Sequence, residues 1–144
     1  MDASLNKFLV PAGRVLLALI FVTSGFAKLT GLQGTADYIA SAGLPLPLLL
    51  ALGAGLLELG GGLALAVGFK ARWAALALGV FTLAAGVLFH AYWSAPAEQA
   101  YVQQLMFMKN LAIAGGLFLA AAFGAGSVSL DARLARGDAR PARA

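Results

Sequence analysis

The chain has 144 residues, of which 61% are hydrophobic and 11% are charged, and its mean hydropathy is +0.87. Soluble domains carry about 25% charged residues, so this composition excludes an ordinary soluble globule, a disordered chain and collagen, and it indicates a protein dissolved in lipid. With no cysteine and one histidine, disulfides, iron–sulfur ligation, thiolate metal sites and a two-histidine haem or metal site within one chain are excluded. We expect no metal site. We also expect no nucleic acid partner. The net charge is +4, but the basic residues are distributed according to membrane topology and do not form a patch.

Four segments are apolar enough to cross the membrane, which requires about 20 residues for roughly 30 Å of hydrocarbon. We place these spans at about 8–28, 44–69, 73–92 and 105–126. The first span is interrupted by Arg14 and lacks a clear cleavage site, so we expect it to be retained and not removed as a signal peptide. Residues 1–126 are therefore predicted to form an all-α integral membrane domain, a bundle of four transmembrane helices.

The segments outside the spans give three further predictions. Between the first two spans, Thr35 and Gly43 favour a short helix that Thr35 caps and Gly43 ends. We expect it to lie in the membrane interface with Tyr38 and Ile39 facing lipid. Residues 127–144 are rich in Ala, Arg, Asp and Gly, and we predict a disordered basic cytoplasmic tail.

The basic residues of the loops predict the orientation of the bundle. With four spans, one side of the membrane receives most of them: Lys7, Lys70, Arg72, Arg133, Arg136, Arg140 and Arg143. The opposite loops contribute only Lys28, with Lys109 just inside the membrane. The positive-inside rule therefore predicts that both termini are cytoplasmic.

The spans carry polar side chains on the same faces as their small residues, which lets these faces meet inside the bundle. The candidate buried polar and ligand-binding residues are Arg14, Lys28, Glu58, His90, Lys109 and Asn110. At about 1.5 Å per residue, Arg14 and Glu58 are predicted to meet as a deep ion pair. The other polar residues are expected near the outer mouth, in a cluster that also includes Tyr38 and Glu98.

Each of these residues also has a structural interpretation. The predicted ion pair would fix helix register, and we give this even weight with a functional role. Lys28 and Lys109 would extend to the headgroups. His90 would form an interfacial hydrogen bond, and Asn110 would bridge two helices.

Six motifs together resemble the DoxX family of small bacterial inner-membrane proteins. They are the segment Arg14–Lys28, Gly43-Leu-Pro-Leu-Pro47, Glu58-Leu-Gly-Gly-Gly62, Gly68-Phe-Lys-Ala-Arg72, Phe89-His90 and the segment Phe107–Gly116. The resemblance covers about residues 7–126. It implies a multi-pass protein of the bacterial inner, or cytoplasmic, membrane, and it makes the six candidate residues the polar positions of the family.

The same resemblance carries the functional expectation. The family takes its name from a relative proposed as a subunit of a thiosulfate:quinone oxidoreductase, and other members are linked to oxidative-stress and thiol-redox assemblies. The resemblance implies that the chain is a quinone-interacting or accessory subunit of a membrane redox complex. Any enzyme activity is then at most that of a subunit. We expect a quinone as the ligand with no covalently bound cofactor, and a homo-oligomer or redox partner proteins in the lipid bilayer. Two alternatives stay open, namely a small-solute or proton transporter that uses Glu58, and a non-catalytic scaffold.

Overall fold

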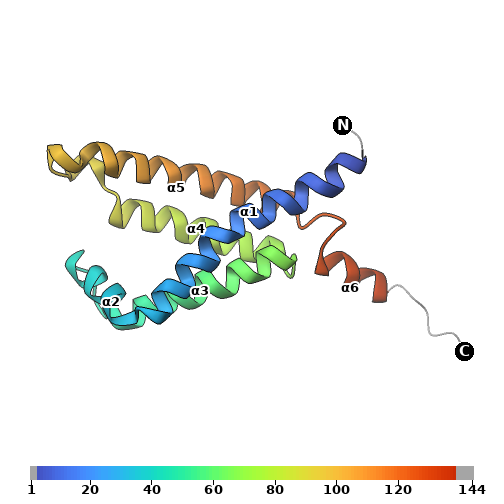
Figure 1. Cartoon of the computed structure of the whole chain (residues 1–144), viewed down its shortest axis with the longest axis horizontal. Coiled ribbons are helices and arrows are strands. Elements are labelled where there is room, and N and C mark those ends of the chain that lie inside the picture. The colour runs from blue at the N-terminus through green and yellow to red at the C-terminus, as the bar shows by residue number, and fades with distance from the viewer. Residues whose placement is uncertain (1–2, 139–144) are drawn as a thin grey trace, which may run out of the picture.

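The computed structural model of the chain describes residues 3–138, and within that range it is all-helical without a strand (Figure 1). The elements are α1 (Ala3–Thr30), α2 (Leu32–Ser41), α3 (Pro47–Val67), α4 (Ala71–Phe89), the 3₁₀ turn η1 (Tyr92–Ser94), α5 (Ala97–Phe123) and α6 (Leu130–Asp138). Four of them, α1, α3, α4 and α5, are long and apolar enough to cross a membrane. The predicted four-span, all-α fold is confirmed.

The fourth span is longer than its sequence suggested. Its polar first turns lower the local hydropathy, so we placed its start near residue 105, but α5 begins at Ala97, directly after Pro96. The earlier start changes the positions of two candidate residues along the helix. Lys109 and Asn110 lie near the middle of this 27-residue helix and not at its outer end.

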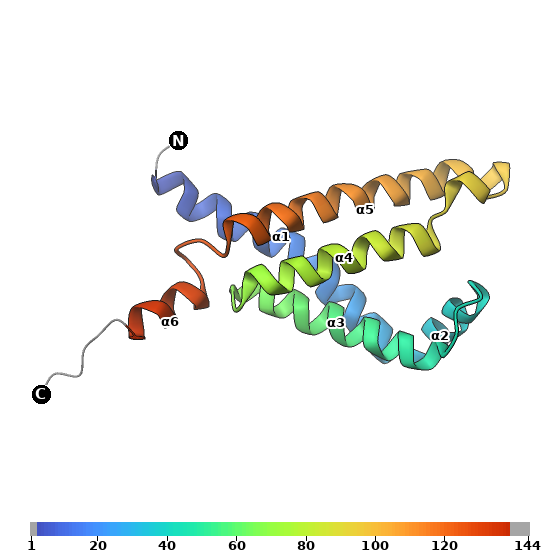
Figure 2. The same cartoon turned by 180° about the vertical axis from the view of Figure 1, so that it is seen from behind.

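The spans form two close helix pairs, α1 with α3 and α4 with α5, and the pairs diverge towards α2 and η1 (Figures 1 and 2). Gly25 makes the first pair possible, because a Cβ atom there would overlap the backbone nitrogen of Leu59 and lie 2.8 Å from the carbonyl oxygen of Gly55. In the second pair, a Cβ atom on Gly79 would lie 2.7 Å from the ring of Phe118. Small residues thus set the approach of the helices, as is usual within membranes.

The short helix α2 exists, but two details of its prediction are wrong. It begins at Leu32, and Thr35 lies inside it, donating a hydrogen bond of 3.2 Å to the carbonyl of Gly31. Ile39 is buried and does not face lipid, because α2 packs back onto α3. Tyr38 is exposed, and its ring stacks on Phe89 of α4 with the ring centroids 5.3 Å apart.

The segment after α5 is ordered in the described residues, so the prediction of a disordered tail is wrong for 127–138. α6 occupies Leu130–Asp138, and the carboxylate of Asp131 accepts hydrogen bonds from the backbone N–H groups of Lys70, at 2.7 Å, and Ala71, at 3.1 Å. These groups lie at the start of α4, where the first N–H groups of a helix have no partner within the helix. Composition did not reveal this polar anchor. Residues 139–144 of the predicted tail lie outside the described residues.

The connections alternate between the two ends of the bundle, as four crossings require. The first residues of α1, the α3–α4 connection and α6 lie at one end, and α2 and η1 lie at the other (Figure 2). The cytoplasmic location of both termini stays a prediction.

Candidate functional site

A cavity of about 640 Å³ lies between the two helix pairs, towards α2. Residues of α1 to α5 line it, most of them apolar. Five of the six candidate residues are among the lining residues: Lys28, Glu58, His90, Lys109 and Asn110. The structure therefore brings together in one cavity all of the six candidate residues except Arg14.

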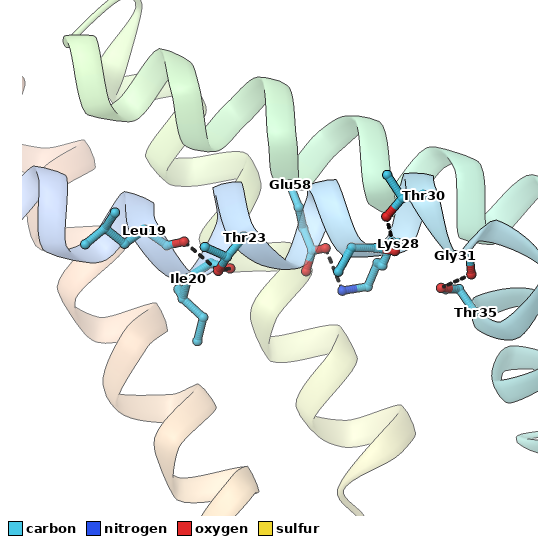
Figure 3. Close-up of polar contacts among 9 residues, drawn as sticks. Leu19, Ile20, Thr23, Lys28, Thr30, Gly31, Thr35 and Glu58 are labelled. Carbon is cyan, nitrogen blue, oxygen red and sulfur yellow. Dashed lines mark hydrogen bonds and ion pairs between the residues drawn. The ribbon is translucent and has the colours of Figure 1, made fainter.

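Glu58 of α3 forms an ion pair with Lys28 of α1, and the two side chains point towards each other across the helix contact (Figure 3). The Nζ atom of Lys28 lies 2.6 Å from Oε2 of Glu58, whose side chain is only 8% exposed. No further hydrogen bond reaches the buried Oε2 atom from the described residues, so Lys28 is the group that compensates its charge. Gly25 and Gly55, each one turn before one of the two charged residues, allow the backbones to approach this closely.

Arg14 does not pair with Glu58, so the predicted deep ion pair is wrong. Its buried guanidinium donates hydrogen bonds to the carbonyl oxygens of Ala66, at 3.2 and 3.3 Å, of Val128, at 3.1 Å, and of Ala125. The depth estimate failed because it measured each residue from the end of its own span, whereas Arg14 packs beside Ala66 in the last turn of α3, about 12 Å along that helix from Glu58 at about 1.5 Å per residue. Arg14 lies about 21 Å before Lys28 along α1 at about 1.5 Å per residue.

The role of Arg14 in the described structure is to satisfy backbone carbonyls. The last carbonyls of a helix have no partner within the helix and carry partial negative charge. Arg14 reaches the end of α3 and the segment that follows α5. Arg72 does the same for Ala122 near the end of α5, at 2.9 Å.

The other polar groups of the cavity come from α4 and α5. Nδ1 of His90 lies 2.9 Å from Oε1 of Gln103, which ties the end of α4 to α5. Asn110 packs against Gly86, where an added Cβ atom would lie 3.3 Å from the Cβ atom of Asn110. Lys109 is exposed, and within the described residues its Nζ atom donates one hydrogen bond, to the sulfur of Met106, at 3.3 Å.

Sequence reasoning missed Gln103 and included Glu98 wrongly. Glu98 is exposed in the first turn of α5 and does not line the cavity. Gln103 fell outside the predicted span, although Pro96 is a signal for an earlier helix start. Within the described residues, no group of three or more His, Asp or Glu side chains is arranged to hold a metal ion.

These features define a small multi-pass membrane protein with a polar cluster inside its helix bundle. The DoxX family profile matches residues 9–91, and the chain belongs to the DoxX family. It is similar to the inner membrane protein YqjF of Escherichia coli (strain K12), with 42% identity over 125 residues that cover 85% of this chain and 88% of the relative. The inner membrane protein YphA of the same strain is 37% identical over 120 residues, covering 83% of this chain and 86% of the relative. No solved structure matches. The chain is thus a multi-pass inner-membrane protein of the DoxX family.

Proposed function

We propose that the chain binds a membrane-soluble quinone in the cavity between its helix pairs and acts as a quinone-interacting or accessory subunit of a membrane redox complex. The observation that carries this proposal is the cavity itself, a mostly apolar space of about 640 Å³ with one cluster of polar side chains. Sites for small ligands are typically concave, largely apolar and about 300–1,000 Å³ in volume, with a few polar groups that orient the ligand.

The lining residues fit the two parts of a quinone. Ile20, Leu57 and Ile113 supply apolar surface for the ring substituents and the tail. Lys109 and Asn110 supply N–H donors for carbonyl oxygens of the ring. A quinone accepts electrons and protons when bound, and the buried carboxylate of Glu58, beside Lys28, is the group of this cavity suited to hold a proton near it.

The experiment uses the fluorescence of Trp93, whose ring packs on Phe107 with centroids 5.4 Å apart. The chain has two tryptophans, so Trp73→Phe leaves Trp93 as the reporter. Titration of this variant with ubiquinone-1 in phosphatidylcholine nanodiscs should quench the emission saturably. Mass spectrometry of the protein purified in mild detergent should find a co-purifying quinone.

A matched pair of α4 substitutions tests whether the quinone binds in the cavity. Ala85 lines the cavity, whereas Ala77 is exposed on the same helix and does not. Ala85→Phe should weaken ubiquinone-1 binding by filling the cavity, and Ala77→Phe should leave it unchanged. Equal effects of the two substitutions, or quenching that never saturates, would contradict the proposal.

A second candidate function, transport of a small solute or of protons, is supported by one observation. Glu58 is buried beside the cavity, and its Oε2 atom accepts no hydrogen bond from the described residues beyond the ion pair with Lys28. Intramembrane carboxylates of this kind mark proton and ion pathways. Proteoliposomes with an internal pH dye would detect proton flux that Glu58→Gln abolishes. A protein with neither flux nor quinone binding would be a scaffold.

A further inference from the structure

Lys109 differs from the other polar residues of the cavity in lacking a strong partner. Lys28 is neutralised by Glu58 at 2.6 Å, and Nδ1 of His90 is engaged by Gln103. Among the described residues, Lys109 has no carboxylate partner, and its exposed side chain donates one hydrogen bond, to a thioether sulfur. Sulfur is a weak acceptor, so the described protein groups leave the N–H donors of this ammonium available to a ligand.

Lys109 lies near the middle of α5, and its side chain is exposed. About 18 Å of helix precede it and about 21 Å follow it, at about 1.5 Å per residue. A lysine side chain extends only about 6 Å, which is less than the distance from Lys109 to either end of the helix. A charge held within a span in this way is costly, and such residues are usually functional.

The cavity therefore carries one uncompensated positive charge beside a mostly apolar lining. Its formally charged lining residues are Lys28, Glu58 and Lys109, of which the first two cancel. A ligand that stabilises this arrangement has an apolar body and, at one end, an oxygen that accepts hydrogen bonds or carries negative charge.

We infer that Lys109 is the residue that recognises the head group of the cavity's ligand, and that the ligand is an amphiphile whose head group presents such an oxygen. The inference rests on the proposed function where the ligand is a quinone, whose carbonyl oxygen meets the requirement. The role of Lys109 in binding the head group would be the same if the ligand were a carboxylate amphiphile. The structure singles out Lys109, because Lys28 already has a partner and Asn110 packs against Gly86.

The test replaces Lys109 in the Trp73→Phe background and follows Trp93 emission in phosphatidylcholine nanodiscs. Lys109→Met keeps the length of the side chain and removes its charge, and Lys109→Arg keeps the charge. Lys109→Met should raise the Kd for ubiquinone-1 about tenfold or more, the effect of losing a hydrogen bond from a charged donor. Lys109→Arg should change it less than about threefold. Lys7→Met, at the other end of α1 and outside the cavity, is the matched control and should have no effect.

A second pair of probes tests head-group recognition without a quinone. Laurate and 1-dodecanol have the same chain, but only laurate carries a carboxylate. The protein with Lys109 should bind laurate about tenfold more tightly than 1-dodecanol, and Lys109→Met should remove this preference. The thermal stability of Lys109→Met should equal or exceed that of the parent protein, because no ion pair is lost among the described residues and a charge within a span is removed.

The outcomes separate the two proposals. Saturable ubiquinone-1 binding that Lys109→Met leaves unchanged would overturn the role of Lys109 and keep the quinone proposal. Laurate selectivity that depends on Lys109, without any ubiquinone-1 binding, would overturn the quinone proposal and keep the role of Lys109. Failure of the protein to bind any of the three probes would overturn both.

Discussion

Lys28 and Glu58 form an ion pair that lies both at the close contact between α1 and α3 and in the wall of the cavity. The Nζ atom of Lys28 lies 2.6 Å from Oε2 of Glu58, and both residues line the cavity while their helices pack through Gly25 and Gly55. A buried carboxylate is tolerated inside a membrane when it is paired. The ion pair therefore lets α1 and α3 place a polar group in the cavity wall without adding net charge to it.

This pairing predicts non-additive stability in a double-mutant cycle. Lys28→Met alone leaves Glu58 buried without its partner, and Glu58→Gln alone leaves the ammonium unpaired. Each should cost less than the about 3–5 kcal/mol typical of a fully buried pair, because the Lys28 side chain keeps 28% exposure. The double variant should recover much of the loss. Unfolding of the four proteins in one detergent measures the coupling, and additive losses would show that the residues do not interact.

Arg14 should be important for stability and independent of Glu58. Arg14→Leu leaves the carbonyls of Ala66, Ala125 and Val128 without their donor, at a cost of at least about 3 kcal/mol. The matched control is Arg72→Leu, which removes an exposed arginine that also bonds carbonyls and should cost less. Losses from Arg14→Leu and Glu58→Gln should add within about 0.5 kcal/mol. Strong coupling between them in detergent unfolding would contradict the structure.

The sequence predicted the spanning helices, the family and most of the residues that surround the cavity. These features depend on hydropathy and on the helical repeat, which are local properties of the sequence. The predicted partner of Glu58 was wrong, because the position of one helix along another depends on how the two pack and cannot be read from the sequence of either. Arg14 bonds Ala66 in the last turn of α3 and therefore lies about 12 Å along α3 from Glu58 at about 1.5 Å per residue.

The C-terminal segment shows a second limit of sequence reasoning. Its low apolar content predicted disorder, since a chain that buries little apolar surface does not fold by itself. In the structure, one carboxylate, Asp131, binds two N–H groups at the start of α4, and the buried Ser129 precedes it. Anchoring of this kind depends on contacts between residues about 60 positions apart, which composition does not reveal.

Removal of the segment after Gly126 should destabilise the bundle. Truncation there deletes Asp131 and the Val128 carbonyl that Arg14 binds. The expected loss is at least about 2 kcal/mol, from a lost helix cap and a lost buried hydrogen bond. Asp131→Ala alone should cost about 1 kcal/mol. Truncation after Asp138 keeps all these contacts and is the control for thermal unfolding in detergent. Equal stability of the two truncated proteins would refute the anchoring role.

The orientation of the bundle can be tested by cysteine labelling, because the natural chain has no cysteine. Tyr38 of α2, Glu98 of α5 and Arg136 of α6 are exposed. The helix α2 and the start of α5 lie at one end of the bundle and α6 lies at the other (Figure 1). The positive-inside rule places the end with Lys70 and Arg72 in the cytoplasm. In intact cells, a membrane-impermeant maleimide should label Tyr38→Cys and Glu98→Cys but not Arg136→Cys. The reverse pattern would invert the topology while leaving the fold unchanged.

The close contact of α1 with α3 predicts that Gly25 tolerates no larger residue. A Cβ atom there would overlap the backbone nitrogen of Leu59 and crowd the carbonyl of Gly55 at 2.8 Å, and backbone atoms cannot move aside as a side chain can. Gly25→Ala should therefore cost about 1–3 kcal/mol, the range for overpacked cores. It should also weaken the coupling between Lys28 and Glu58, because the helices that carry them must separate.

The control for Gly25 is Gly60 on α3, where an added Cβ atom would meet nothing within 4 Å. Gly60→Ala removes only a residue of low helix propensity, so this variant should be as stable as the parent or up to about 1 kcal/mol more stable. Detergent unfolding of both variants, each with and without Lys28→Met, measures stability and coupling together. A Gly25→Ala protein as stable as Gly60→Ala, with undiminished coupling of the ion pair, would mean that α1 and α3 are farther apart than the structure shows. In that case the wall of the cavity would have to be held together by something other than the glycine contact.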